Sequence, residues 1–598
     1  MSPRAPVNFL KSPLPFILLG SILLFNLAPF LHFAGETFAA NYYIDGSKGT
    51  NSNPGTEDLP LKTISAGVSK AFAGDTVWIF SGTYRETINL VRGGSGPADP
   101  IAIRSMPDAE VHIKGSDLVS AWAPHAGSIW KRDNWGVNSQ QVFVDGVPLQ
   151  QIGEGSPFHT TLFDGKPILK PTGLGLSDMG PGTFWYNLPE KVLYVWLPDG
   201  SDPNLHTVEA STRNWIIPPK ELSYIELTGL EFAHSNQTSI GQGAGIVNAW
   251  GRSWIISKCS FVFGDFAGLE ILGEEHTLTD NSFNFNGALG IYIQGSGPAY
   301  EWKSHLPTRP PQNITLRRNE TNFNNYRHFN YYWGAGGLKA IPSCNKILVS
   351  EHKAMSNYGP GIWFDGWCQN IEINRCISKN NQGAGIFFEI SDYAIISNNL
   401  VVGNKAQGIY IAASNSANVY NNTVVENWAG IVVHGMPRSE HPALCNNAVK
   451  NNIISDSIQA DLVVYVDPLN PCSNTSDYNL YFQQVGTVKI SWTTNSGYAI
   501  NHSNLNSLTT QTGQESHSMI ADPLWSNRSL GDYSLTQGSP AIDAGAEVQG
   551  IGNQDLLGQD RIKAGLQSGQ PSIDIGAYEY QQISPVNISP PKNLRVTF

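Results

Sequence analysis

Charged residues are scarce in this sequence. Asp, Glu, Lys and Arg make up 14% of its 598 residues, whereas they make up roughly 25% of an average soluble domain. The 49 acidic residues outnumber the 37 basic ones, which leaves a formal charge of −12 at pH 7, and the basic residues form no stripe. Because nucleic acids are bound by clustered cationic side chains, the composition argues against a nucleic-acid partner.

Cysteine and methionine are also rare, with six residues of each. No two cysteines have the CxxC spacing of zinc sites, so no zinc centre is expected. We expect Cys259 and Cys376 to be buried free thiols, and Cys445 and Cys472 are candidates for a loop-closing disulfide in an exported protein. Gly is common instead, with 59 residues beside 11% aromatic residues. This composition suits β-structure with many turns and surfaces that face sugars.

Long apolar runs are absent after the first forty residues. Residues 13–33 carry no formal charge, follow the basic Arg4 and Lys11, and precede small residues at 37–40. This pattern predicts a signal peptide at 1–40 and therefore a secreted, cell-surface or periplasmic protein. The alternative is an uncleaved anchor, in which case the chain would contact a membrane.

A Gly followed by an aliphatic residue recurs with a period of about 23 residues. A coil of three short strands and three turns fits this period, whereas propeller blades need about forty residues. The first and third residues after Gly are apolar in successive repeats, which places them on the inner face of a strand. The sequence therefore predicts an all-β right-handed parallel β-helix, a solenoid, whose repeats start at Gly245, Gly268, Gly290, Gly337, Gly361, Gly385, Gly408 and Gly430.

Five segments are expected along the chain. The signal segment is followed by an N-terminal cap with the first coils, an inserted β-rich domain where the period is lost, a central β-helix, and a C-terminal β-rich segment. Their expected bounds are 1–40, 41–117, 118–222, 223–480 and 481–598. An amphipathic helix at 63–71 is expected to cover the open end of the apolar tube, and helix is expected almost nowhere else.

An Asn recurs thirteen residues after several of the repeat glycines, at Asn281, Asn374, Asn398 and Asn421. Asn tolerates left-handed turns, and stacked Asn amides share hydrogen bonds from one coil to the next. We therefore interpret these residues as a structural Asn ladder.

Two acidic residues fall on neighbouring outward positions. If each repeat Gly is counted as zero, positions two and four point outward, and position four holds Ala249, Leu272, Gln294, Ile341, Asp365, Glu389, Ala412 and His434. Stacked strands lie about 4.8 Å apart, so the carboxyls of Asp365 and Glu389 are expected about 5 Å apart, which is the spacing of the two acids in a retaining glycosidase.

Aromatic and polar side chains surround this pair in the sequence. We expect substrate contacts from Lys339, Trp363, Trp367, Phe387, Tyr410, His434 and Trp333. Two of them have a second interpretation: His434 as a merely exposed ladder residue, and Lys339 as a counter-ion of the two acids. The residues before Gly337, which include His328, Tyr331, Tyr332 and Trp333, either form a cleft wall or fill an irregular coil.

The local motifs match a known family. The segments GPGIWFD at 359–365 and GIFFEIS at 385–391 resemble those of secreted bacterial β-helix proteins and are similar to the β-helical β-xylosidases of glycoside hydrolase family 120. This resemblance implies a retaining glycoside hydrolase with Asp365 as nucleophile and Glu389 as acid/base, acting on an oligo- or polysaccharide. It covers the N-terminal segment, the inserted domain and the central coils, and the tail after about Thr475 lies outside it.

Two alternatives stay open. A polysaccharide lyase of β-helix fold would use Lys339 as the base and Ca²⁺ to neutralise a uronic carboxylate, whereas the hydrolase needs no cofactor. A non-catalytic carbohydrate-binding or cell-surface protein would use the same fold without chemistry.

Overall fold

The structure of the chain is a computed structural model. It describes residues 39–581 except 154–161, 164, 168–171, 238–242, 296–309, 436–443, 467–472, 494–500 and 563–571. Cys472 and all but the last two residues of the expected signal peptide therefore fall outside the described residues. No helix among the described residues is long and apolar enough to cross a membrane.

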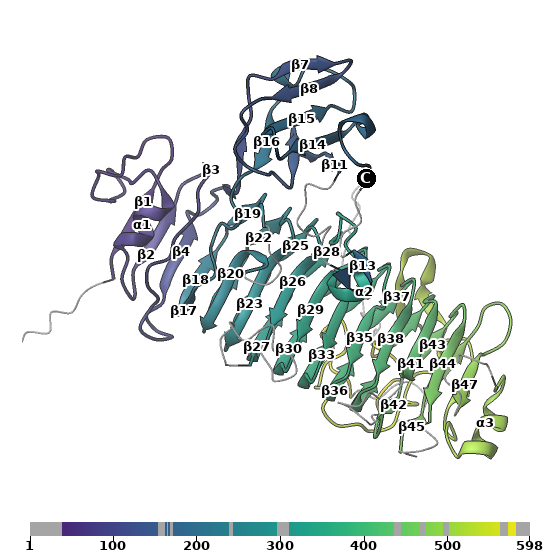
Figure 1. Cartoon of the computed structure of the whole chain (residues 1–598). Coiled ribbons are helices and arrows are strands. Elements are labelled where there is room, and N and C mark those ends of the chain that lie inside the picture. Colours follow the sequence, from purple (N-terminus) through teal and green to yellow (C-terminus); the bar gives the residue numbers. More distant parts are fainter. Residues whose placement is uncertain are drawn as a thin grey trace, which may run out of the picture. The chain divides into compact units, whose positions relative to one another are not determined.

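The chain folds as a right-handed parallel β-helix, as predicted (Figure 1). Each central coil has three strands: the first two join a 24-stranded sheet, and the third joins a 13-stranded sheet. The coil that contains Asp365 consists of β32 (Ile362–Asp365), β33 (Gln369–Asn374) and β34 (Ile377–Lys379). The next coil consists of β35 (Ile386–Glu389), β36 (Asp392–Ser397) and β37 (Leu400–Val402).

The predicted interior stack is confirmed. Ile362 pairs with Ile386, Ile386 with Ile409, and Ile409 with Ile431 in the parallel register, and all four side chains are fully buried in one apolar core. Flanking first strands of the same sheet are β29 (Gly336–Ile341), β38 (Gln407–Ala412) and β41 (Ala429–His434). Side chains at alternate positions of these strands therefore point away from the core.

The first repeat is offset by one residue from the prediction. In β20 (Gly245–Arg252) and β23 (Ala267–Glu274), Trp250 rather than Ala249 pairs with Leu272. Gly245 is opposite Ala267, so this coil is one residue shorter than the spacing of the two glycines. The outward ladder at that end therefore begins with Trp250, while Ala249 is buried in the core.

Asn ladders do connect the coils, but mostly through residues other than those predicted. Asn357, Asn381, Asn404 and Asn427 are buried and bonded in series, with each Nδ2 donating to the next Oδ1 at 2.9 Å. Asn281 joins a second ladder through Asn319.

The predicted Asn398 and Asn421 adopt left-handed turns with φ of 58° and 53°, and Asn421 Oδ1 accepts from Asn451 Nδ2 of the next coil at 3.2 Å. The following residues, Asn399 and Asn422, form the ladder at 2.9 Å. The period identified the corner, but two adjacent Asn occupy it, and only the second points inward. The predicted Asn374 bonds Ser397 Oγ rather than another Asn.

Helices close both ends of the apolar tube. The helix predicted at 63–71 is α1 (Ile64–Lys70), with Thr63 Oγ1 as its N-terminal cap and with Ile64 and Val68 in the core. Beside β47 (Ile490–Thr493), the last strand of the long sheet, α3 (Leu505–Thr512) places Leu508 in the same core (Figure 1). The sequence did not predict α3, nor the short α2 (Tyr331–Gly334).

The described residues between the first coils and the central repeats form two larger sheets and a two-stranded one, β12 (Leu162–Phe163) with β13 (Lys166–Pro167). One of the larger sheets is four-stranded and contains β6 (Ser116–Leu118), β9 (Val142–Val144), β10 (Val147–Pro148) and β16 (Val208–Ser211). The other is five-stranded and contains β7 (Ala123–Ala126), β8 (Ile129–Arg132), β11 (Gln150–Gln151), β14 (Thr183–Asn187) and β15 (Val192–Trp196). Both sheets share an apolar cluster of their own around Phe184 and Leu193.

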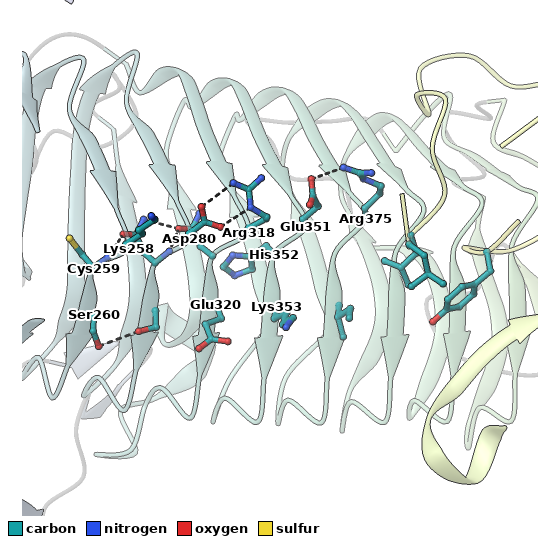
Figure 2. Close-up of a pocket in the computed structure, with 17 residues that line it drawn as sticks. Lys258, Cys259, Ser260, Asp280, Arg318, Glu320, Glu351, His352, Lys353 and Arg375 are labelled. Atoms are coloured by element: carbon teal, nitrogen blue, oxygen red, sulfur yellow. Dashed lines mark hydrogen bonds and ion pairs between the residues drawn. The ribbon is translucent and has the colours of Figure 1, made fainter. Parts of the chain in front are cut away.

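A row of charged residues occupies the corner between the second and third strands (Figure 2). Lys258, Asp280, Arg318, Glu351 and Arg375 all have left-handed φ values and alternate in sign from coil to coil. Arg318 binds Asp280 at 2.7 Å, and Arg375 binds Glu351 at 2.5 Å. The row lines a groove of about 660 Å³ that ends against the C-terminal segment at Leu556, Leu557 and Tyr578.

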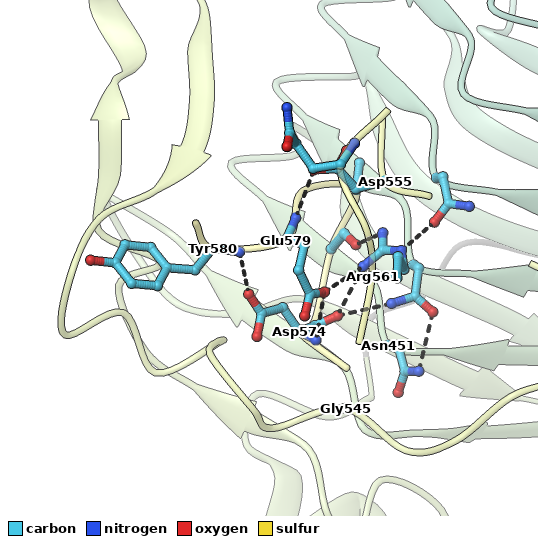
Figure 3. Close-up of polar contacts among 12 residues, drawn as sticks. Asn451, Gly545, Asp555, Arg561, Asp574, Glu579 and Tyr580 are labelled. Carbon is cyan, nitrogen blue, oxygen red and sulfur yellow. Dashed lines mark hydrogen bonds and ion pairs between the residues drawn. The ribbon is translucent and has the colours of Figure 1, made fainter. Parts of the chain in front are cut away.

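The C-terminal segment continues along the same face of the coils. Tyr533, Ala577 and Tyr578 pack on Leu400 and Val425 of the third strands. Arg561 is buried within this contact (Figure 3). It donates to Asn398 Oδ1 at 2.8 Å, to the Gly576 carbonyl at 2.7 Å, and to Glu579 Oε2 at 3.4 Å.

Four cysteines are buried free thiols: Cys259, Cys344, Cys368 and Cys376. This confirms the expectation for Cys259 and Cys376. Cys445 is disulfide-bonded, in line with the expected loop closure.

At the corner between the second and third strands, His352 takes the position that Asn319 takes one coil earlier. Its burial makes the fold sensitive to acid. His352 follows the left-handed Glu351 as Asn319 follows Arg318, and its Nδ1 has no hydrogen-bond partner among the described residues. Burial lowers the pKa of His352 to about 3. An unfolded His titrates near 6.5, so the unfolded state binds more protons between these values, and stability is lost as the pH falls through this window.

We expect His352→Asn to remove this acid sensitivity. Between pH 7 and pH 5, its free energy of unfolding should fall by about 2 kcal/mol less than that of the wild type, as measured by urea unfolding at each pH. The other buried histidines are common to both proteins and cancel in the comparison. His125→Asn, at an exposed site, is the matched control. An equal fall in wild type and His352→Asn would contradict the assignment.

Candidate active site

The three strands β29, β32 and β35 place the predicted acids and their neighbours on one outward face. Asp365 pairs directly with Glu389 in the parallel register. Lys339 pairs with Trp363, and Trp363 pairs with Phe387. The predicted ladder positions of these five residues are therefore confirmed.

Asp365 is held by a buried ion pair. Lys339 Nζ lies 3.0 Å from Asp365 Oδ2, and the two side chains are 3% and 12% exposed. The same ammonium lies 3.2 Å from the centroid of the Trp363 ring. An ion pair and a cation–π contact both require a charged ammonium, and both are stronger when water is excluded. Lys339 is thus a fixed positive charge beside Asp365.

The aromatic side chains of the site form a stack along the helix axis. The ring centroids of Trp363 and Phe387 are 5.0 Å apart, and those of Phe387 and Tyr410 are 4.9 Å apart, with interplanar angles of 15° and 8°. Lys339 covers one face of Trp363, and Phe387 covers the other. The stack therefore presents ring edges rather than ring faces to a ligand on this side of the helix.

Trp367 and His434 lie at the margins of the acid pair. The ladder continues past Asp365, since Gly366 N donates to the Glu389 carbonyl at 3.2 Å and Trp367 N to the Ile390 carbonyl at 2.6 Å. Trp367 is therefore fixed two residues beyond Asp365. His434 pairs with Ala412, which separates it from Glu389 by one coil. The side chain of Trp333 lies outside the described residues.

A buried carboxylate on the same face was missed by the sequence reasoning. Glu270 occupies the Lys339 position two coils earlier, through Tyr292. It is fully buried, and its Oε2 accepts from Trp250 Nε1 at 3.0 Å. Counting position two in every repeat, as was done for position four, would have found it.

Within the described ranges, no three His, Cys, Asp or Glu side chains are grouped so that they could hold a metal ion. The groove of Figure 2 lies at the corner between the second and third strands, and its lining includes none of the predicted site residues.

The fold and the stacked outward ladder define a right-handed parallel β-helix protein. Residues 244–424 match the family model described as the right handed beta helix region. The uncharacterized protein YwoF of Bacillus subtilis is 32% identical over 109 residues, which are 18% of this chain and 23% of that protein. Pectate lyase PEL9 of Emericella nidulans is 36% identical over 81 residues, which are 13% of this chain and 20% of that protein. The chain therefore matches less than a quarter of the length of these relatives.

A solved structure matches over nearly the whole chain. The complex structure of XylC with xylose aligns with 90% of this chain and 98% of its own, with a TM-score of 0.62 and 15% sequence identity. At this identity the likeness concerns the fold.

We expect Lys339→Met to destabilise the protein by about 3 kcal/mol, because it leaves the buried Asp365 carboxylate unpaired. Asp365→Asn alone should destabilise it less, and the double variant Lys339→Met/Asp365→Asn should recover most of the loss. The measurement is a double-mutant cycle by urea unfolding at pH 7. Additive effects of the two substitutions would show that the ion pair has no coupling energy.

Proposed function

We propose that the chain is a carbohydrate-active enzyme, a β-xylosidase-like retaining glycoside hydrolase in which Asp365 is the nucleophile and Glu389 the acid/base. The observation that carries the proposal is the direct pairing of Asp365 with Glu389. Neighbouring strands lie about 4.8 Å apart, and retaining glycosidases hold their two carboxyls about 5–5.5 Å apart.

The two acids have different surroundings, which supports different roles. Asp365 carries the ion pair with Lys339 at 3.0 Å, so a cation lies beside the group proposed as the nucleophile. A carboxyl group next to a fixed negative charge retains its proton more readily, which suits Glu389 as the proton donor. Two like charges on adjacent strands are otherwise unfavourable, so a catalytic role would explain why the chain carries both acids here.

The proposed reaction has two steps. First, an Asp365 carboxylate oxygen attacks the anomeric carbon, the bond from that carbon to the leaving oxygen breaks, and Glu389 transfers its proton to the leaving oxygen. Second, Glu389 takes a proton from water, the water oxygen attacks the anomeric carbon, and the ester bond to Asp365 breaks. Two inversions retain the anomeric configuration, and both carboxyl groups return to their starting protonation states.

Two further observations support a xylose-type substrate. The motifs that contain Asp365 and Glu389 are similar to those of the family 120 β-xylosidases. The fold match to XylC, whose structure contains xylose, extends over 90% of this chain. Secretion, through the apolar N-terminal segment, would bring the enzyme to external plant-type polysaccharide.

Replacing each acid should separate the two steps. Asp365→Ala should abolish formation of the glycosyl-enzyme, and azide should not restore a product of retained configuration. Glu389→Ala should lose roughly 100- to 10,000-fold in rate on substrates with poor leaving groups. It should stay active on aryl xylosides with good leaving groups, and azide should accelerate it. The assay is colour release from aryl glycosides, with product anomers read by NMR.

Glu372→Gln is the matched control, since Glu372 is a half-buried acid on β33 of the same coil. It should leave the rate unchanged. Unsaturated uronic products from polygalacturonate, lost in Lys339→Ala and kept in Glu389→Ala, would instead establish a lyase. Sugar binding without turnover of any substrate would establish a binding protein.

A further inference from the structure

Four aromatic residues gather at the turn between the third strand of one coil and the first strand of the next. We call His328, Tyr331, Tyr332 and Tyr358 the tyrosine rim. Tyr332 is 72% exposed and Tyr358 is 38% exposed. Both contact the ring of Tyr331, and exposed aromatic clusters commonly mark binding surfaces.

The rings of the rim are held in place by each other. The centroids of His328 and Tyr358 are 4.2 Å apart at 79°, and those of Tyr331 and Tyr358 are 5.9 Å apart at 88°, so both contacts are edge-to-face. The hydroxyl of Tyr331 donates to that of Tyr332 at 3.1 Å. Asn330 Oδ1 caps α2 by accepting from Tyr332 N. Little side-chain freedom is then left to lose on binding a ligand.

The rim lies at the N-terminal end of the first strands that carry Lys339 and Asp365. A methyl group added at Gly334, the last residue of α2, would lie 3.9 Å from Lys339 Cδ, so the end of the helix that carries Tyr331 and Tyr332 lies near the stem of Lys339. Tyr358 precedes Asp365 by seven residues in the same coil, and seven residues span at most about 23 Å. An oligosaccharide whose scissile bond is at Asp365 and Glu389 can therefore reach the rim with its next few units.

The chemistry of the rim matches a neutral sugar. It offers ring surface for C–H groups, and phenol hydroxyls and an imidazole for hydroxyl groups, with no carboxylate or guanidinium among its members. Burial raises the pKa of Tyr331 to about 12, so its hydroxyl stays a neutral donor. On the following coils the same corner carries Gln382 and Lys405, which are exposed and add hydrogen-bond donors along the edge.

We propose that the tyrosine rim is a sugar-binding subsite that holds a neutral pyranose unit of an oligosaccharide beyond the bond that is cleaved. The inference rests on the proposed function for the direction of the sugar chain, and it assigns the enzyme to oligosaccharides rather than to disaccharides alone. The stacked rings of Trp363 and Phe387 have both faces covered, so Tyr332 and Tyr358 supply the ring surface that those residues cannot offer.

The test is binding of xylohexaose, measured by calorimetry on the inactive background Glu389→Gln. Tyr332→Ala/Tyr358→Ala should weaken binding by about tenfold or more, since aromatic contacts contribute at this level, whereas Tyr332→Phe/Tyr358→Phe should keep most of the affinity. Tyr393→Ala is the control: Tyr393 is 58% exposed and lies in the same coil as Glu389, past the other end of β35. In the active enzyme, the rim variant should lower kcat/KM on xylohexaose.

The outcomes of this test separate the inference from the proposed function. Equal binding by the rim variant and its background overturns the subsite, and so does equal loss in the Tyr393→Ala control. Rim-dependent binding in a protein without hydrolytic activity would retain the subsite and refute the hydrolase. A rim variant that changes only the sedimentation of the protein, with sugar binding intact, would show that the rim is a contact between two copies of the chain.

Discussion

Parallel pairing in strict register is the constraint on which this protein depends. Each residue lies over its counterpart one coil earlier, as Ile362, Ile386 and Ile409 do, so a side chain always meets the side chain of an equivalent position. Apolar residues therefore form continuous interior stacks, and corner amides form chains of hydrogen bonds at 2.9 Å. The register that builds the core also fixes which residue follows which along each outward ladder.

The strict register makes the acid pair energetically unfavourable, and this explains why a cation lies beside it. Register places Glu389 over Asp365 and would leave two carboxylates in repulsion. Lys339 on the preceding coil offsets that repulsion through its ion pair, and Trp363 orients the ammonium by a contact of 3.2 Å. The aromatic stack then continues through Phe387 and Tyr410. The face of the Trp363 ring contacts the Lys339 ammonium and is not available to a ligand. Residues outside the stack would therefore have to contact the faces of a ligand's rings.

The sequence predicted those parts of the structure that repeat. A Gly and two alternating apolar residues recur in each coil, which is enough to set the register of Asp365 against Glu389. It failed where the period is locally broken, as at Trp250, or where adjacent residues are chemically alike, as at Asn398 and Asn399. Contacts such as Arg561 with Asn398 join residues 163 positions apart, and no periodic signal predicts them. Glu270 was predictable in principle, because it occupies an outward ladder position.

The corner between the second and third strands shows how the non-repeating tail is accommodated. From Lys258 to Arg375 its left-handed residues are charged and neutralise each other between coils. In the next three coils they are Asn398, Asn421 and Asn451, and their amides donate to carbonyls of the C-terminal segment at Ile551, Asp574 and Ala546. A charged corner residue would be buried unpaired under that segment, whereas an amide can satisfy a fixed carbonyl. The change falls between the coil of Asp365 and the coil of Glu389, and the C-terminal segment already contacts the first of these coils at Asn374 and Arg375, so the covered part of the helix begins at the acid pair.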